Sequence, residues 1–465
     1  MNDLNDIRIS RQSRTMKTFG ILIGIFLFTL TLPAWAGEFS KGDQIRLAED
    51  TPLFFKDTLV RTGKRGERFT VIVSDAKWRR VYVSSRNTAG QEIALSISVD
   101  AVEPVQAPEA GLGPATQIPA ALAARFGAEN RAKAMAMNGG KPEGEEAVIR
   151  GLQFLAKTQN EDGSWGKGLK PYVSAMTGFG LLSFLGHGET PDSPQFGPAV
   201  KSAVRWIAQN GRQSDGRLSM ERSFSQSGVY AHAIATFALA EYYSVTRDPE
   251  VVDSLTKAIA YIVDGQGPDG GWMYAYDKSQ SDTSVSGWQI QALKAAFLSG
   301  LNLNGVDTAL DKAMLNLKRV QGPKGGFGYR NNQDKYSLTG VGVYCTYSWK
   351  QEKDKSVRDG IEFMMDETRK NFPVNYEGDK PNLYAWYYNT LACAAVGGPS
   401  WQTWNAMFRD QITRHQSRDG SWPVLAKSAG GEIQADPEGI GPFYRTNLCI
   451  LMLEVYYRYT WTANR

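Results

Sequence analysis

Three polar residues in or directly before apolar helical stretches have side chains able to transfer protons: Asp282, His232 and Tyr387. A carboxylate, an imidazole and a phenol can each act as a general acid or base when its pKa suits the working pH. Asp282 and His232 also have a structural interpretation. Asp282 precedes an apolar helical run, as a helix N-cap does, and a single histidine in an apolar helix is commonly a hydrogen-bonded core residue.

Aromatic side chains form a second set of candidates, for binding a ligand. Residues 384–389 read Tyr-Ala-Trp-Tyr-Tyr-Asn, which is too dense in rings for one helix face, so some rings must point into a cavity or to solvent. Flat apolar rings suit isoprenoid and sugar ligands alike. Arg445, at the start of the last apolar helix, could hold an anionic group or form a salt bridge. The candidates are Tyr230, Trp288, Tyr344, Tyr384, Tyr388, Tyr444 and Arg445.

A repeated turn indicates which elements must position these residues. Beyond residue 145 a Gln, a glycine turn and an aromatic residue recur with a period of about 54 residues. Glycine supplies backbone conformations that other residues resist. The turn residues are Gln159, Gly163, Trp165, Gln266, Gly270, Trp272, Gln321, Gly325, Phe327, Gln416, Gly420 and Trp422.

Each turn joins two different kinds of helix. An amphipathic helix runs into the turn, and a helix that is apolar nearly all round follows it. This alternation predicts an outer ring of helices packed around an inner ring. Six pairs are expected, and six hairpins can close a circle without capping repeats. The expected pairs span 146–186, 199–244, 252–300, 308–350, 356–396 and 402–459.

The repeat resembles that of squalene and terpenoid cyclases, the prenyltransferase/squalene oxidase repeat family, over residues 145–460. The shared features are a basic residue, an aromatic-Leu pair, Gln and then Gly-x-Trp, as in Arg150, Phe154, Gln159 and Trp165. The resemblance implies a mainly α protein with an (α/α)6 toroid. It also implies a structural role for the turn residues, in which each Gln meets a neighbouring helix end and each Trp stacks near it.

The catalytic sets of that family are not matched. The acidic Asp-x-Asp-Asp cluster of the cyclases has only Asp282, in the segment 279–283. The prenyltransferase zinc site needs an Asp where Val343 stands beside Cys345, and His415 lies in an outer turn. The Gly-Cys-Gly-Glu-Gln segment of complement-type thioester domains is absent. We therefore expect no metal site and no cofactor.

Two functional hypotheses remain open, beside a structural one in which both domains are parts of an envelope assembly. The first is a toroid that binds an unknown hydrophobic, carbohydrate or protein ligand in or over its central cavity. The second is an enzyme of isoprenoid cyclisation or polysaccharide lyase type with an unusual site around Asp282, His232 and Tyr387. Lyases and hydrolases on such toroids need a Tyr/His pair or two carboxylates across the cavity. Tyr230 with His232, or Asp282 with Glu241, could supply such a pair.

The first 36 residues indicate export. Basic residues precede an apolar run from Phe19 to Leu32, and small residues around Ala36 suit cleavage by a signal peptidase. We expect a periplasmic or extracellular protein. The alternative is an uncleaved signal anchor, which would be its one contact with a membrane.

Residues 37–105 predict a separate β domain. Short β-rich runs alternate with glycines at 44–47, 53–55, 68–73, 80–84 and 92–98. Their spacing resembles a bacterial SH3-like barrel. Residues 106–145 are rich in Ala, Pro and Gly, which is typical of a linker with one short helix near 120–137, and the toroid is expected from residue 146 to 465.

Charge and cysteine content exclude some classes of protein. The formal net charge of +4 falls to +2 without residues 1–36, which hold four basic and two acidic residues, so nucleic acid is not expected as a partner. Cys345, Cys393 and Cys449 are odd in number and lie in apolar helical stretches, which argues against a disulfide framework.

Overall fold

The chain divides into two compact units, Met1–Glu109 and Ala110–Arg465. The computed structural model describes residues 44–55, 58–65, 67–75, 80–86, 92–98, 101–104, 118, 120–166, 170–210, 215–219, 226–301, 303–349, 353–425, 436 and 439–459. The expected signal peptide, residues 1–36, lies outside these ranges. Among the described helices, none has the length and apolarity needed to cross a membrane.

The first unit is a small antiparallel β domain, as the sequence predicts. Its strands are β1 (Gln44–Leu47), β2 (Thr51–Phe55), β3 (Thr58–Gly63), β4 (Arg68–Asp75), β5 (Arg80–Arg86), β6 (Glu92–Ser98) and β7 (Val102–Pro104). They lie in the order β3-β2-β6-β5-β4-β1-β7. The sequence did not predict β3 and β7, because β3 is exposed at five of its six positions and carries no apolar alternation. Likeness to an SH3 domain stays a prediction.

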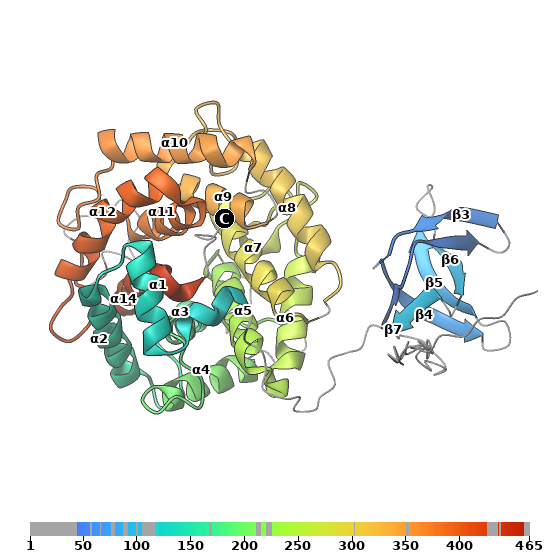
Figure 1. Cartoon of the computed structure of the whole chain (residues 1–465), viewed down its shortest axis with the longest axis horizontal. Helices are drawn as coiled ribbons and strands as arrows, with labels where there is room; N and C mark the ends of the chain where they lie inside the picture. The colour runs from blue at the N-terminus through green and yellow to red at the C-terminus, as the bar shows by residue number, and fades with distance from the viewer. Residues whose placement is uncertain are drawn as a thin grey trace, which may run out of the picture. The chain divides into compact units, whose positions relative to one another are not determined.

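The second unit is a double ring of helices (Figure 1). The outer helices are α2 (Pro142–Thr158), α4 (Gly197–Asn210), α6 (Val252–Asp264), α8 (Val306–Val320), α10 (Lys355–Lys370) and α12 (Gly398–Arg414). The inner helices are α3 (Lys170–Gly186), α5 (Gln226–Thr246), α7 (Thr283–Leu298), α9 (Tyr336–Ser348), α11 (Leu383–Val396) and α14 (Gly441–Leu453). These six pairs match the predicted ones to within a few residues at most ends.

The apolar character of the inner helices explains their position. Every residue of α11 except Tyr384 and Val396 is buried, whereas α10 buries one face only. A helix that is apolar all round must be covered on most sides, and an amphipathic helix can form the surface. Each inner helix contacts the next along the chain, and α14 contacts α3, so the inner ring is closed.

The repeated turns bind neighbouring outer helices together. The Gln266 Nε2 donates to the Gly270 carbonyl at 2.8 Å and to the Ala309 carbonyl of the next outer helix at 2.7 Å. The Trp272 Nε1 donates to the Ile262 carbonyl at 2.8 Å, which fixes the turn to the end of its own helix. The turns that begin at Gln159 and Gln416 repeat this pattern. The Gln321 turn keeps both glutamine bonds, although Phe327 replaces the tryptophan.

The same interaction closes the outer ring. The Gln416 Nε2 of the last turn donates at 2.8 Å to the Ala147 carbonyl of α2, the first outer helix. Gly420 lies so close to the Arg150 carbonyl that a Cβ there would approach the oxygen to 2.2 Å. The last repeat therefore makes with the first helix the same contact that Gln159, Gln266 and Gln321 make with the outer helices that follow them.

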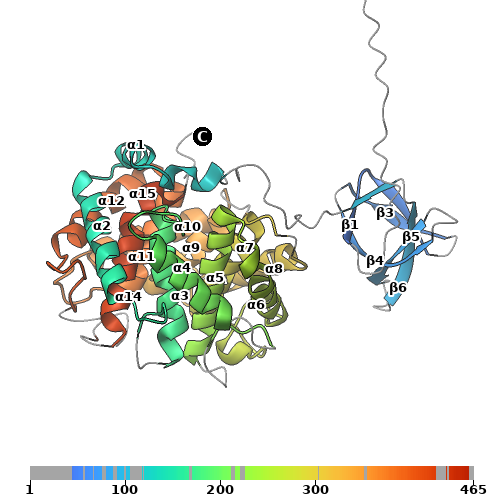
Figure 2. The same ribbon diagram turned by 90° about the horizontal axis from the view of Figure 1, so that it is seen from below.

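The segment before α2 belongs to the second unit. Within residues 106–145, expected to be a linker, η2 (Ala120–Arg125) and α1 (Ala128–Asn138) lie over one end of the ring (Figure 2). Arg125 is fully buried, and its guanidinium lies 2.9 Å from the Glu241 carboxylate of α5. Burial alone would raise the pKa of Glu241, but the charges of Arg125 and Arg458 outweigh it and lower the pKa to about 2. This segment closes the end of the ring at which the inner helices finish.

Candidate functional site

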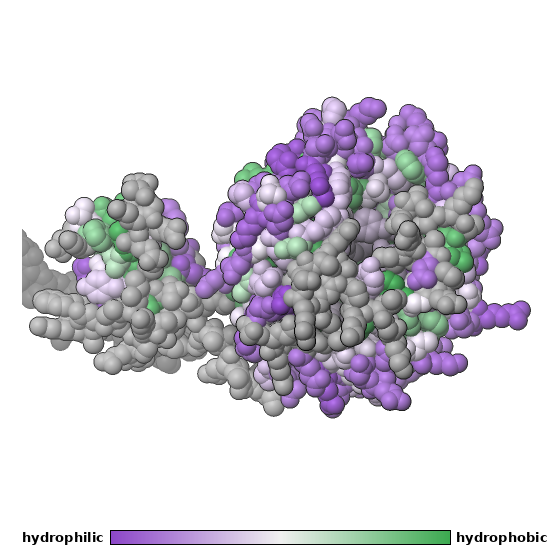
Figure 3. All heavy atoms as spheres, turned by 180° about the vertical axis from the view of Figure 1, so that it is seen from behind, coloured by the Kyte–Doolittle hydropathy of each residue, from purple (hydrophilic) through white to green (hydrophobic). Residues whose placement is uncertain are grey.

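The opposite end of the ring holds a cavity of about 600 Å³. All six inner helices contribute side chains at or near their first turns, because the inner helices run parallel to one another and begin at this end. Figure 3 shows this face of the ring, and most of the described residues around its outer edge are hydrophilic. One lining residue from each inner helix in turn is Tyr172, Tyr230, Trp288, Leu338, Tyr384 and Tyr444.

The floor of the cavity is apolar and aromatic. Ala175, Met176 and Ile234 lie beside a cluster of rings. The ring centroids of Phe179 and Trp288 are 5.2 Å apart in an edge-to-face arrangement. These packed rings give the floor a fixed shape that is suited to an apolar body.

Tyrosine hydroxyls supply most of the polarity of the wall. The Tyr230 hydroxyl lies 2.8 Å from the Ser284 Oγ, and the Tyr329 hydroxyl lies 2.6 Å from that of Tyr274. The Tyr384 hydroxyl oxygen is buried and makes no hydrogen bond to a described residue. Burial, and next the charge of the Asp282 carboxylate, raise the pKa of Tyr230 well above its usual value of 10. At neutral pH this phenol keeps its proton and serves as a hydrogen-bond donor.

Asp282 lies behind the cavity wall as the N-cap of α7. Its Oδ1 accepts hydrogen bonds from the Ser284 N–H at 2.7 Å, the Val285 N–H at 3.2 Å and the Ser284 Oγ–H at 2.5 Å. The side chain is fully buried. It is hydrogen-bonded to Ser284, which lines the cavity and contacts the Tyr230 hydroxyl.

His232 lies in the core and does not line the cavity. Its Nδ1 accepts from the Leu218 N–H at 3.0 Å, and its Nε2 lies 3.1 Å from the Ala258 carbonyl, so the proton of a neutral ring resides on Nε2. Burial lowers the pKa of His232 to about 4. The ring is therefore uncharged at neutral pH and joins α5 to two neighbouring segments.

The structure separates the remaining sequence candidates. Tyr230, Trp288, Tyr384 and Tyr444 line the cavity. Tyr387 stacks on Trp288 from within the core, with ring centroids 5.8 Å apart, and burial raises the pKa of Tyr387 to about 12. The Tyr388 hydroxyl accepts a hydrogen bond from the Gln291 Nε2 at 2.9 Å.

Two further candidates lie away from the cavity. Tyr344 is near the other end of the ring, where the Lys294 Nζ lies 5.6 Å from its ring centre. The Arg445 Nε donates to the Trp422 carbonyl at 3.1 Å, and one Nη donates to the Asp436 carbonyl, so this guanidinium holds a turn in place.

Several lining residues were missed from the sequence: Tyr172, Phe179, Tyr329, Lys335 and Asn382. The last two are the N-cap residues of α9 and α11. A ring of parallel inner helices brings all their N-termini to one face. The residue directly before each inner helix could therefore have been predicted from the sequence as a lining residue.

Cys345, which stands at the position of the prenyltransferase zinc ligand, is fully buried in α9. Burial raises the pKa of its thiol to about 12, so it remains protonated and is a poor metal ligand. In the described ranges, no group of three or more His, Cys, Asp or Glu side chains is placed to hold a metal ion.

Known structures share the fold of the second unit, whereas no protein-family model and no curated protein match the sequence. Cellobiose 2-epimerase from Spirochaeta thermophila superposes with a TM-score of 0.51 at 14% identity, over 71% of this chain and 98% of the epimerase. Two other toroids superpose less well. An α-1,6-mannanase from Salegentibacter has a TM-score of 0.48 at 11% identity, over 68% of this chain and 98% of the mannanase. The type II terpene cyclase MstE from Scytonema has a TM-score of 0.46 at 12% identity, over 68% of this chain and 98% of the cyclase. Together with the closed double ring, the likeness to the epimerase shows that the second unit has the α/α toroid fold predicted from its repeat.

Proposed function

We propose that this chain is an exported binding protein that holds the apolar part of a small molecule in the cavity where the inner helices begin. The observation that carries the proposal is the composition of the cavity wall. Packed aliphatic and aromatic side chains form the floor, and protonated tyrosine hydroxyls surround it. Burial of apolar ligand surface on such a floor is favourable by roughly 25 cal/mol per Å².

The wall favours a hydrophobic ligand over a carbohydrate. A bound sugar places many hydroxyl groups out of water, and each needs a hydrogen-bond partner. Among the described lining residues, Asn382 is the one with a side-chain amide, and none is Asp, Glu, Arg or Gln. The tyrosine and serine hydroxyls and the Lys335 ammonium remain, and two of the hydroxyls already bond to each other.

The described residues favour binding over catalysis. A general acid or base works best with a pKa near the working pH, but the pKa of Tyr230 lies well above 10 and that of His232 is about 4. The Asp282 carboxylate accepts three hydrogen bonds at a helix start and lies behind the wall. An enzymatic role for the cavity remains the competing hypothesis, and turnover of a bound ligand would support it.

Filling part of the cavity should weaken binding. In the purified protein we expect the neutral dye Nile red to fluoresce on binding and to be displaced by 1-dodecanol but not by cellobiose. Met176, which lines the floor and is 3% exposed, can be replaced by the larger Trp. Met176→Trp should weaken dodecanol binding by about tenfold or more, since roughly 1.4 kcal/mol of lost burial is sufficient.

Met137→Trp is the matched control, because Met137 is 58% exposed on α1, at the other end of the ring. This variant should bind as the parent does. Displacement of the dye by cellobiose, or equal binding by both tryptophan variants, would show that the cavity does not hold an apolar ligand.

A further inference from the structure

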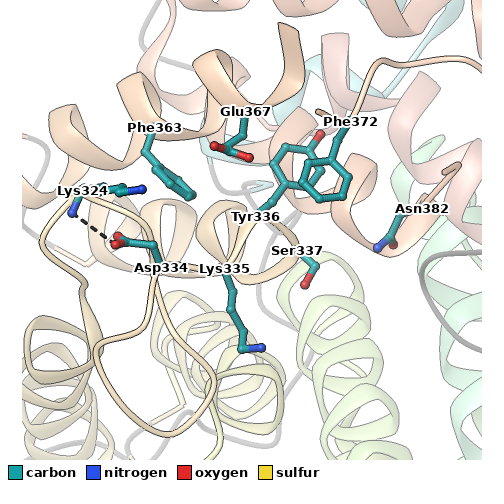
Figure 4. Close-up of a pocket in the computed structure, with 9 residues that line it drawn as sticks. All are labelled: Lys324, Asp334, Lys335, Tyr336, Ser337, Phe363, Glu367, Phe372 and Asn382. Carbon is teal, nitrogen blue, oxygen red and sulfur yellow. Dashed lines mark hydrogen bonds between the residues drawn. The ribbon is translucent and has the colours of Figure 1, made fainter. Parts of the chain in front are cut away.

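A surface groove continues the cavity outward. The groove has a volume of about 390 Å³ and lies between the start of α9 and the end of α10 (Figure 4). Lys335, Ser337 and Asn382 line both the groove and the cavity. These three residues, here termed the mouth, mark where an apolar ligand in the cavity would meet water.

Lys335 supplies the mouth with an ammonium group that forms no salt bridge with a described carboxylate. The two nearby acidic side chains already accept hydrogen bonds: Asp334 from the Gly326 N–H at 2.7 Å and the Lys324 N–H at 3.3 Å, and Glu367 from the Asn371 Nδ2 at 2.9 Å. In Figure 4 the Lys335 side chain extends away from both of them. Its ammonium is the one formal charge among the described residues that line the cavity.

The other mouth groups are hydrogen-bond donors. Asn382 is 5% exposed, and its Oδ1 accepts from the Ala385 N–H at 3.0 Å, so its Nδ2 is left to donate. Ser337 adds a hydroxyl. The first N–H groups of α9 receive no side-chain cap, and the start of a helix favours a negative charge.

We propose that the mouth binds the carboxylate of an amphiphile whose apolar tail occupies the cavity. This inference rests on the proposed function and adds the chemistry of the head group. One ammonium and a few neutral donors suit a single negative charge, whereas a diphosphate would need several cations. The Asp282 carboxylate is not one of the mouth residues: it is fully buried and accepts hydrogen bonds from the start of α7.

Matched ligands separate the head group from the tail. Laurate and 1-dodecanol have tails of equal length, so we expect laurate to displace Nile red at about tenfold lower concentration, as a charge-assisted hydrogen bond would allow. In Lys335→Gln this advantage should disappear while dodecanol binding stays unchanged. Lys133→Gln, at an exposed position on α1, makes the same change of net charge and should behave as the parent.

Each other outcome has a distinct meaning. Equal displacement by laurate and dodecanol, or an advantage of laurate that survives in Lys335→Gln, would overturn the carboxylate site and leave the apolar cavity standing. A stronger effect of dodecyl phosphate than of laurate would overturn the assignment to a carboxylate. Failure of both laurate and dodecanol to displace the dye would refute the proposed function itself.

Discussion

At the scale of single residues, the turn glycines combine two constraints. Gly270 has a φ of +86°, which is unfavourable for any residue with a Cβ. A Cβ at this position would also approach the Lys312 carbonyl oxygen of α8 to 2.2 Å. The glycine is therefore needed both for the shape of the turn and for the contact between repeats.

A pair of glycine variants can separate these constraints. Gly300 has a φ of +76°, but a Cβ there would meet nothing closer than an Arg247 nitrogen at 4.0 Å. Gly300→Ala should lower the free energy of unfolding by about 1–2 kcal/mol through backbone strain alone. Gly270→Ala should cost about 1–3 kcal/mol more, because the helices must move apart. Urea unfolding measures both, and equal losses would show that the close approach is unimportant.

The residue scale also shows what the sequence could not supply. Residue type alone left Asp282 and His232 with two interpretations each. An aspartate can be a helix cap or a catalytic carboxylate, and a histidine can be a core residue or a catalytic base. Their hydrogen bonds distinguish these roles. Lys335 was overlooked because its importance comes from the absence of a described carboxylate partner, which depends on the orientation of side chains far apart in the chain.

At the scale of elements, His187 joins three helices near the end of α3. Its Nδ1 lies 2.7 Å from Glu189 and its Nε2 lies 3.2 Å from Glu145 of α2, which also accepts from the Arg131 Nε of α1 at 2.8 Å. Burial alone would lower the pKa of His187, but its hydrogen bonds to both glutamates outweigh burial and raise the pKa. The charged imidazole thus stabilises the junction of α1, α2 and α3.

The stability of this junction should depend on pH. Because the folded pKa of His187 is raised, its contribution is complete below the unfolded value of about 6.5 and is lost as pH rises through the folded pKa. For Glu145 burial raises the pKa, but His187 and Arg131 outweigh it and lower it to about 2. Its contribution is complete above about 4.5 and is lost as pH falls towards 2.

This pH dependence can be tested by measuring the free energy of unfolding of the parent and of His187→Gln at pH 6 and pH 9. Loss of charge-assisted hydrogen bonds in the parent should lower its free energy of unfolding by about 1.5–3 kcal/mol between these values. His187→Gln should lose much less over the same interval. Parallel pH profiles for the two proteins would show that this imidazole does not carry the effect.

The elements were the most predictable level of the structure. The six helix pairs and the two-ring arrangement followed from the repeat, because helical periodicity and glycine turns are local signals. The shape of the cavity depends on how rings from α3, α7, α11 and α14 pack together. Such packing is not encoded in any single stretch of sequence. Similarly, the composition of residues 120–138 suggested a linker, but contacts such as Arg125 with Glu241 make them part of the toroid.

At the scale of the whole molecule, the proposal of export makes a prediction about the chain's N-terminus. Residues 1–36 have the basic and apolar regions and the small-residue boundary of a signal peptide. Protein recovered from the periplasm or medium of its host should begin at Gly37, as intact mass and N-terminal sequencing would show. Recovery of the uncut chain in the membrane fraction would indicate an anchor instead.

The hydrogen bond from Gln416 to Ala147 has a consequence for how this chain can vary. In an open array of repeats, a unit can be inserted or lost and the ends simply move apart. Here an added or missing hairpin would break the seam between last and first helices and leave their polar groups unmatched. Insertions and deletions in homologous sequences should therefore be confined to the loops between helices, and the number of hairpins should stay at six.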